Sequence, residues 1–208
     1  MSRRPGVAIR AVTLALLATT AACALPPEMA GPGGPPQGTG PDVLPPPGYG
    51  TLRQSEVSIA LTSGPLQLMV TPLDESVTRM TAPDTYRRLR GMVDAHGEGS
   101  VETARLFLVS FYSEQADTRF VPEEVQLLAR GQRVRPTAIT PVTPSWGERR
   151  LAQRATEMAV YAFPSTVDLE SDLTLVYGLE QSGAWTTILP RIQAERARAR
   201  GRAGIGGS

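Results

Sequence analysis

The chain has 208 residues, with 21 basic and 20 acidic side chains and a formal net charge of +1 at pH 7. All of the basic residues are arginines, and a chain this close to neutrality lacks the basic excess expected of a nucleic-acid-binding protein. The single cysteine excludes an intramolecular disulfide, so the fold must depend on its apolar core.

The first 22 residues have the layout of a secretory signal peptide. Arginines stand at positions 3, 4 and 10 with no acidic residue among them, and the next segment reads AVTLALLATTAA. This apolar run is about a dozen residues long, whereas a membrane-spanning helix needs about 20. A retained transmembrane anchor is therefore the weaker alternative for this segment.

The only cysteine directly follows this apolar run. The segment Thr20-Ala21-Ala22-Cys23 resembles the lipobox of bacterial lipoproteins, in which the peptide is cut before the cysteine and the cysteine is acylated. The resemblance implies that Cys23 is a lipid anchor, and Ala24 in place of Asp implies the outer membrane, with the domain facing the periplasm. Ala22-Cys23-Ala24 is also a small-x-small cleavage site. Cleavage after it would release a secreted protein, and this alternative stays open.

A proline-rich segment follows the cysteine and predicts a disordered tether. Residues 26–50 contain nine prolines, which suit neither helix interiors nor strand ladders. A segment of about 25 residues reaches roughly 30 to 75 Å, depending on its stiffness, and can hold a domain away from a bilayer. The predicted organisation is a signal peptide over 1–22, a tether over 23–50, a β-domain over 51–190 and a basic helix with a disordered tail over 191–208.

Short apolar runs separated by proline and glycine predict a mostly β domain. In residues 55–62, Val57, Ile59 and Leu61 alternate with other residues, and residues 66–71 repeat this period of two, which is typical of half-buried strands. Seven or eight such strands predict a single antiparallel β-sandwich. The remaining strands are expected over 103–113, 124–130, 133–140, 156–163, 173–178 and 185–189.

Two helices are expected to interrupt the strands. Thr81 and Pro83 are typical of a helix start, and the apolar spacing after them predicts a helix that stops at Gly97. The second helix is expected to begin at Pro190 and to run to about Arg200.

Two further stretches of sequence suggest a kind of sandwich. FVPEEVQLLARGQRVRPTAITPV, which begins at Phe120, and AVYAFPSTVDLESDLTLVYG, which ends at Gly178, resemble immunoglobulin-like domains of bacterial envelope lipoproteins. The resemblance implies an immunoglobulin-like sandwich, and the patterns above add a short inserted helix and a C-terminal helix to it. It supplies no catalytic residues.

His96 is the only histidine, so a Ser-His-Asp or Cys-His site would have to use it. Its place near a helix end favours a structural role, in which the imidazole interacts with the helix dipole. Asp94, His96 and Glu98 would share a face on a strand but not on a helix. Neither a metal nor a cofactor is therefore expected.

Acidic side chains offer two further kinds of chemistry. Asp168, Glu170 and Asp172 alternate with other residues, but the glycine and glutamate of an EF-hand loop are missing, so a solvated turn is favoured and weak calcium binding stays open. Glu123 and Glu124, together with Asp168 and Glu170, are candidate carboxylates for a hydrolase that acts on cell-wall material. Such an enzyme needs two carboxylates roughly 5 to 10 Å apart.

The segment SWGERR places Trp146, Arg149 and Arg150 in a loop between strands. Trp and Arg are typical hot-spot residues of protein interfaces, so this loop is a candidate interface. The alternative is that Trp146 plugs the end of the sandwich.

The C-terminal helix carries five arginines and is a second candidate interface, with Arg191, Arg196 and Arg198 as its possible contact residues. A basic helix can bind anionic lipid or an acidic polymer. Pairing of the arginines with Glu195 would instead give a solvated surface helix.

The sequence thus favours a membrane-anchored, non-catalytic binding or scaffolding lipoprotein of the bacterial cell envelope. Its expected partners are the membrane, through the N-terminal lipid, and another envelope protein or a cell-wall polymer. A hydrolase and a lipid-binding arginine tail remain the alternatives.

Overall fold

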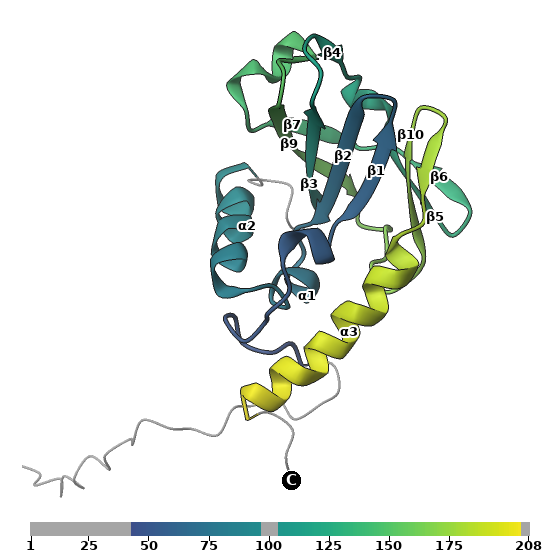
Figure 1. The fold of residues 1–208 in the computed structure, drawn as a ribbon. Coiled ribbons are helices and arrows are strands. Elements are labelled where there is room, and N and C mark those ends of the chain that lie inside the picture. The colour runs from purple at the N-terminus through teal and green to yellow at the C-terminus, as the bar shows by residue number, and fades with distance from the viewer. Residues whose placement is uncertain (1–42, 97–103, 205–208) are drawn as a thin grey trace, which may run out of the picture. The chain divides into compact units, whose positions relative to one another are not determined.

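Two antiparallel sheets pack face to face and form the body of the protein (Figure 1). The computed structural model describes residues 43–96 and 104–204. Within these residues, eleven strands pair in an antiparallel manner and three α-helices accompany them. The prediction of a mostly β sandwich with a C-terminal helix is therefore confirmed.

The larger sheet has five strands in the order β1-β2-β3-β9-β7. At its centre, β3 and β9 pair along their whole length, from Ala104 opposite Pro164 to Ser113 opposite Ala155. The strands are β1 Ile59–Ser63, β2 Leu66–Pro72, β3 Ala104–Ser113, β7 Ala138–Pro141 and β9 Ala155–Pro164.

The smaller sheet has four strands in the order β11-β10-β5-β6, and a separate two-stranded ribbon joins β4 to β8 at one end of the sandwich. The strands are β4 Thr118–Arg119, β5 Val125–Ala129, β6 Gln132–Val134, β8 Arg150–Leu151, β10 Leu173–Tyr177 and β11 Glu180–Ser182.

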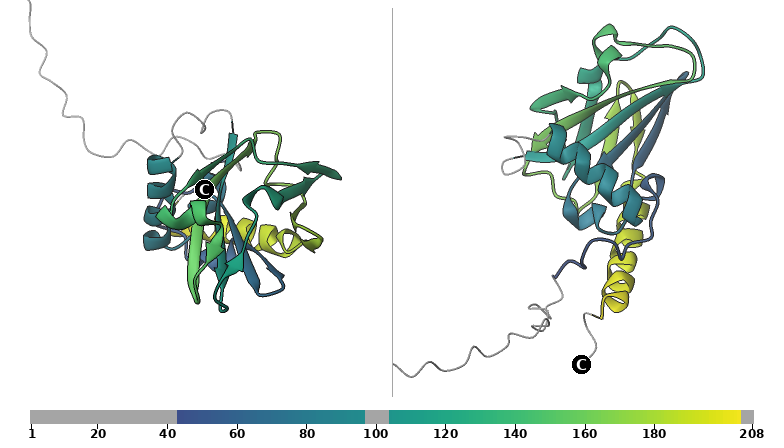
Figure 2. Two further views of the ribbon diagram at one scale, coloured as in Figure 1. Left: turned by 90° about the horizontal axis from the view of Figure 1, so that it is seen from above. Right: turned by 90° about the vertical axis from the view of Figure 1, so that its left-hand side faces the viewer.

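The helices lie outside the sandwich. Figures 1 and 2 show α2 against the outer face of the five-stranded sheet, while α3 extends from the smaller sheet. The helices are α1 Glu75–Thr78, α2 Pro83–His96 and α3 Trp185–Arg202, and 3₁₀ turns occupy Gln54–Glu56, Pro122–Glu124 and Pro144–Glu148.

The main core lies between the two sheets, where alternate residues of each strand meet. Phe107 and Phe111 of β3 and Tyr161 and Phe163 of β9 are fully buried. The Tyr161 hydroxyl donates a hydrogen bond to the carbonyl oxygen of Pro122 at 3.0 Å. Burial raises the pKa of Tyr161 far above its ordinary value, so this hydroxyl remains a donor.

A second, smaller core lies under α2. Leu89 and Val93 of the helix pack on Leu106, Leu108 and Val160, which point outward from β3 and β9. The predicted helix is thus confirmed, and its apolar stripe covers the part of the outer face that β3 and β9 form with these residues.

The segment 133–140, expected as one strand, is divided between the two sheets. β6 pairs with β5, whereas β7 pairs with β9. Pro136, between them, has no N–H group for a strand ladder, and the next residue, Thr137, already donates to Ala162 of the other sheet at 2.7 Å.

The expectation of a strand over 185–189 is wrong, because these residues form the start of α3. The buried positions of this helix recur every three or four residues, which is the helical period, and they are Trp185, Ile188, Ile192, Glu195 and Ala199. Because Glu195 in this stripe is charged, the apolar residues of the sequence alone do not show the helical period. Pro190, which is typical of a helix start, lies inside the helix instead.

Residues 43–50, expected to belong to the tether, lie against the folded body. Arg200 donates to the carbonyl oxygen of Val43 at 2.8 Å, and Arg202 donates to that of Tyr49 at 2.6 Å. The last helix, α3, therefore binds residues 43–50, which are the first residues that the structure describes.

Candidate binding groove

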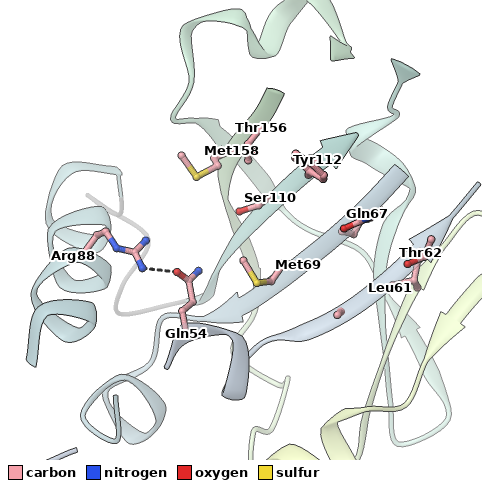
Figure 3. Close-up of a pocket in the computed structure, with 12 residues that line it drawn as sticks. Gln54, Leu61, Thr62, Gln67, Met69, Arg88, Ser110, Tyr112, Thr156 and Met158 are labelled. Carbon is pink, nitrogen blue, oxygen red and sulfur yellow. Dashed lines mark hydrogen bonds between the residues drawn. The ribbon is translucent and has the colours of Figure 1, made fainter. Parts of the chain in front are cut away.

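An open groove lies on the outer face of the five-stranded sheet, beside the part that α2 covers (Figure 3). The strand register places Ala60, Met69, Ser110 and Met158 in one row across β1, β2, β3 and β9. Small and large side chains alternate along this row. Ala60 and Ser110 are small, so they leave space on the floor of the groove beside the longer side chains of Met69 and Met158. The groove has a volume of about 390 Å³.

A second row borders the groove with polar groups. Thr62, Gln67, Tyr112 and Thr156 face one another across the same four strands. Their hydroxyl and amide groups line one side of the apolar row, and all four are at least partly accessible.

The opposite side of the groove is closed by α2 and by the first 3₁₀ turn. Arg88 of α2 donates to the side-chain carbonyl of Gln54 at 2.6 Å, as the dashed line in Figure 3 shows. The amide nitrogen of Gln54 in turn donates to the hydroxyl of Thr71 at 2.9 Å, and that hydroxyl lies 2.7 Å from the hydroxyl of Ser58. The sheet therefore orients Gln54, and Gln54 holds the guanidinium at the mouth of the groove.

The chemistry of this lining suits binding. Arg88 is the one charged side chain among the described lining residues, which include no carboxylate, imidazole or thiol. General acid–base chemistry needs such groups within hydrogen-bond reach of a substrate. Methionine is flexible and polarisable, so the apolar row can adapt to ligands of irregular shape.

No pattern in the sequence predicted this groove as a whole. One local signal was available, because Met69 and Met158 are apolar residues at outward positions of alternating strands. Arg88 and Gln54 carry no such signal, since they are 34 positions apart and meet only in the folded chain.

The predicted interface loop turns its tryptophan inward. Trp146 is 6% exposed, and its ring lies 5.1 Å from that of Phe120. The buried carboxylate of Glu157 holds the loop by accepting a hydrogen bond from the Ser145 hydroxyl at 2.5 Å. Trp146 therefore plugs the end of the sandwich, and the alternative of an exposed anchor at this residue is wrong.

The two arginines of the same loop remain on the surface. Arg149 pairs with Glu123 at 2.7 Å, and Arg150 pairs with Asp117. All four side chains are more than one third exposed, so these pairs contribute little to stability.

The acidic turn after β9 is held by arginines. Asp168 accepts a hydrogen bond from the backbone N–H of Glu170 at 2.9 Å and pairs with Arg130 at 3.0 Å, and both interactions lower its pKa. Burial acts to raise the pKa of Glu170, but hydrogen bonds from Arg196 and from a neighbouring glutamine outweigh it and leave the pKa lowered. Asp172 lies beside this turn, near the start of β10.

Three of the four carboxylates considered for a hydrolase are thus engaged with different arginines. Glu123 pairs with Arg149, Asp168 with Arg130, and Glu170 with Arg196, while Glu124 follows Glu123 in the same 3₁₀ turn. A catalytic general acid needs a raised pKa. The pKa shifts of Asp168 and Glu170 have the opposite direction.

The arginines predicted as a C-terminal interface divide into two groups. Arg196 donates to the carbonyl oxygen of Ser76 at 3.3 Å and pairs with Glu170 at 2.8 Å, so it ties α3 to α1 and to the acidic turn. Arg191 and Arg198 are exposed, and Arg198 lies 3.8 Å from Glu195.

Asp94 and His96 lie near the C-terminal end of α2, where Asp94 pairs with Arg90 at 3.1 Å. Glu98 and the proposed lipidation site Cys23 lie outside the described residues. In the part of the chain that the structure describes, no group of three or more potential ligands is arranged to hold a metal ion.

Comparison with protein-family models, with curated proteins and with solved structures returned no significant match. Among residues 43–96 and 104–204, no helix combines the length and apolar character needed to cross a membrane.

Proposed function

We propose that the protein is a membrane-anchored, non-catalytic binding lipoprotein of the bacterial cell envelope. The binding part of this proposal rests on one observation, the open groove of about 390 Å³ on the large sheet. That volume falls within the range of small-ligand sites, which is roughly 300 to 1,000 Å³. The anchoring part rests on the lipobox-like segment that ends at Cys23 and on the proline-rich residues after it.

The polar groups of the fold support a non-catalytic function. The groove offers apolar surface, hydroxyl and amide groups and one cation, without a described acid or base. Three of the four carboxylates considered for a hydrolase, Glu123, Asp168 and Glu170, are paired with arginines, and the pKa values of Asp168 and Glu170 are lowered.

The arrangement of α3 favours the groove over the arginine-rich helix as the binding surface. Arg196, Arg200 and Arg202 make hydrogen bonds within the fold. These side chains hold the segment 43–50 and α1 in place, so they are less available to an external polymer or lipid.

Membrane anchoring is tested by Cys23→Ser in the full chain with its signal segment. We expect the wild-type protein to sediment with the membranes and the variant to move to the soluble envelope fraction. A variant that still sediments with the membranes would contradict the lipid anchor.

Groove binding is tested by Ala60→Trp, which fills the floor at an exposed position of β1. Native mass spectrometry of both proteins, isolated from the envelope, is expected to detect bound small molecules on the wild type and to lose them in the variant. Circular dichroism checks that the variant is folded. Identical ligand occupancy of the two folded proteins would overturn the groove as the binding site.

A further inference from the structure

Arg88 brings a positive charge to the groove that no carboxylate among the described residues pairs with. Its guanidinium donates to the neutral side-chain oxygen of Gln54. Two neighbouring arginines differ in this respect, because Arg79 and Arg90 both pair with Glu75. A guanidinium has five N–H donors, so one bond to Gln54 leaves Arg88 able to bind an anion.

The position of this guanidinium is determined before a ligand arrives. The side-chain nitrogen of Gln54 donates a hydrogen bond to the Thr71 hydroxyl, which fixes the amide group. Its side-chain oxygen then accepts the hydrogen bond from Arg88. Figure 3 shows Arg88 extending from α2 toward the row of groove residues. Preorganisation reduces the entropy lost on binding. The planar fork of a guanidinium also matches the two oxygens of a carboxylate.

The rest of the groove forms one narrow apolar track. Adjacent strands lie about 4.8 Å apart, so the three steps from Ala60 on β1 to Met158 on β9 span about 14 Å. The polar row that includes Thr62 and Thr156 limits the track on one side, and α2 limits it on the other. A track formed by a single row of residues suits one extended hydrocarbon chain.

We propose that the groove binds a single-chain amphiphile with a carboxylate head, of the medium-chain fatty-acid class; this inference rests on the binding function proposed above. The carboxylate binds Arg88, and the hydrocarbon chain lies across the sheet along the row of Ala60, Met69, Ser110 and Met158. Burial of the chain supplies the affinity, and Arg88 supplies the selection for an anionic head.

The test is isothermal titration of the full mature chain, carrying Cys23→Ser, with sodium decanoate, decanol and decyl phosphate as separate probes. Arg88→Gln is expected to weaken decanoate binding about 10- to 150-fold, since a charge-assisted hydrogen bond contributes about 1.5 to 3 kcal/mol and each 1.4 kcal/mol changes the affinity tenfold. Decanol binding should hardly change. Arg88→Lys, which keeps the charge and loses the fork, should fall between the wild type and Arg88→Gln.

Arg87→Gln is the matched control. Arg87 is the preceding residue of α2, it is exposed, and it does not line the groove, so decanoate should bind this variant as it binds the wild type. The inference is overturned if Arg88→Gln binds decanoate as tightly as the wild type does. It is also overturned if decanol or decyl phosphate binds the wild type more tightly than decanoate.

The two proposals fail in distinguishable ways. Absence of decanoate binding, combined with a native ligand that Ala60→Trp removes, would reject the fatty-acid class and leave the binding function standing. Absence of both would reject the groove as a binding site altogether.

Discussion

The carboxylate of Glu195 on α3 accepts two hydrogen bonds from Thr51, one from its backbone N–H at 3.0 Å and one from its hydroxyl at 2.8 Å. The two residues are 144 positions apart, so this contact joins the beginning of the described chain to its last helix. The Glu195 side chain is 2% exposed, and Arg202 balances its charge.

We expect Glu195→Ala to lower the free energy of unfolding by about 2 kcal/mol, because it removes hydrogen bonds to a buried charge. Urea unfolding measures this loss. The control is Arg198→Ala. The Arg198 side chain is 67% exposed and lies 3.8 Å from the same carboxylate, so its removal should lower the free energy of unfolding by less than about 0.5 kcal/mol. Equal losses in the two variants would contradict the role assigned to Thr51.

Acid stability should depend on Asp74, the N-cap of α1, which accepts a hydrogen bond from the N–H of Ser76 and pairs with Arg105. Burial acts to raise the pKa of Asp74, but the bonds from Ser76 and the charge of Arg105 outweigh it and leave the pKa lowered. A lowered pKa stabilises the folded state above the unfolded value of about 3.9, and the contribution is lost as the pH falls through the folded value.

Asp74→Asn should therefore have a lower Tm than the wild type at pH 7, and the difference should shrink as the pH falls below about 4. Thermal unfolding followed by circular dichroism across this range provides the measurement. A Tm difference that stayed constant down to about pH 2 would show that the charge of Asp74 has no part in stability.

Trp146→Ala should destabilise the protein by about 3 to 5 kcal/mol, since it removes a large buried side chain from the aromatic cluster. Arg149→Ala, which removes one member of an exposed ion pair in the same loop, should change stability by less than about 0.5 kcal/mol. Chemical denaturation measures the free energy of unfolding of both variants and so shows whether Trp146 acts as a core residue or as a surface residue. A folded Trp146→Ala variant with wild-type stability is the result that this interpretation does not allow.

Pro190→Ala should stabilise the protein by about 1 kcal/mol or more, because alanine restores an N–H donor inside α3 and removes a ring that disfavours the helix. The site is exposed, so the substitution disturbs no packing. A helix that began at residue 190 would predict no gain, since proline is well suited to the first helical position. Thermal unfolding distinguishes these two expectations.

The β-sandwich and α2 were predictable because their signals are local. Val57, Ile59 and Leu61 repeat with a period of two, and the buried residues Leu89 and Val93 of α2 repeat with a helical period. The start of α3 was not predictable in this way. Its buried stripe includes Glu195, whose charge is acceptable there only because Thr51 and Arg202 meet it in the folded chain.

The sequence by itself determined the secondary-structure class, the near-neutral charge and the lipobox-like segment at Cys23, since each of these is a property of neighbouring residues or of composition. Only the tertiary structure decided that Trp146 points inward and that Arg88 lines the same groove as the outward-facing Met69 and Met158. The physical reason is that these features arise where distant segments pack together. The register of four strands and the docking of α2 create the groove, and no local pattern encodes either of them.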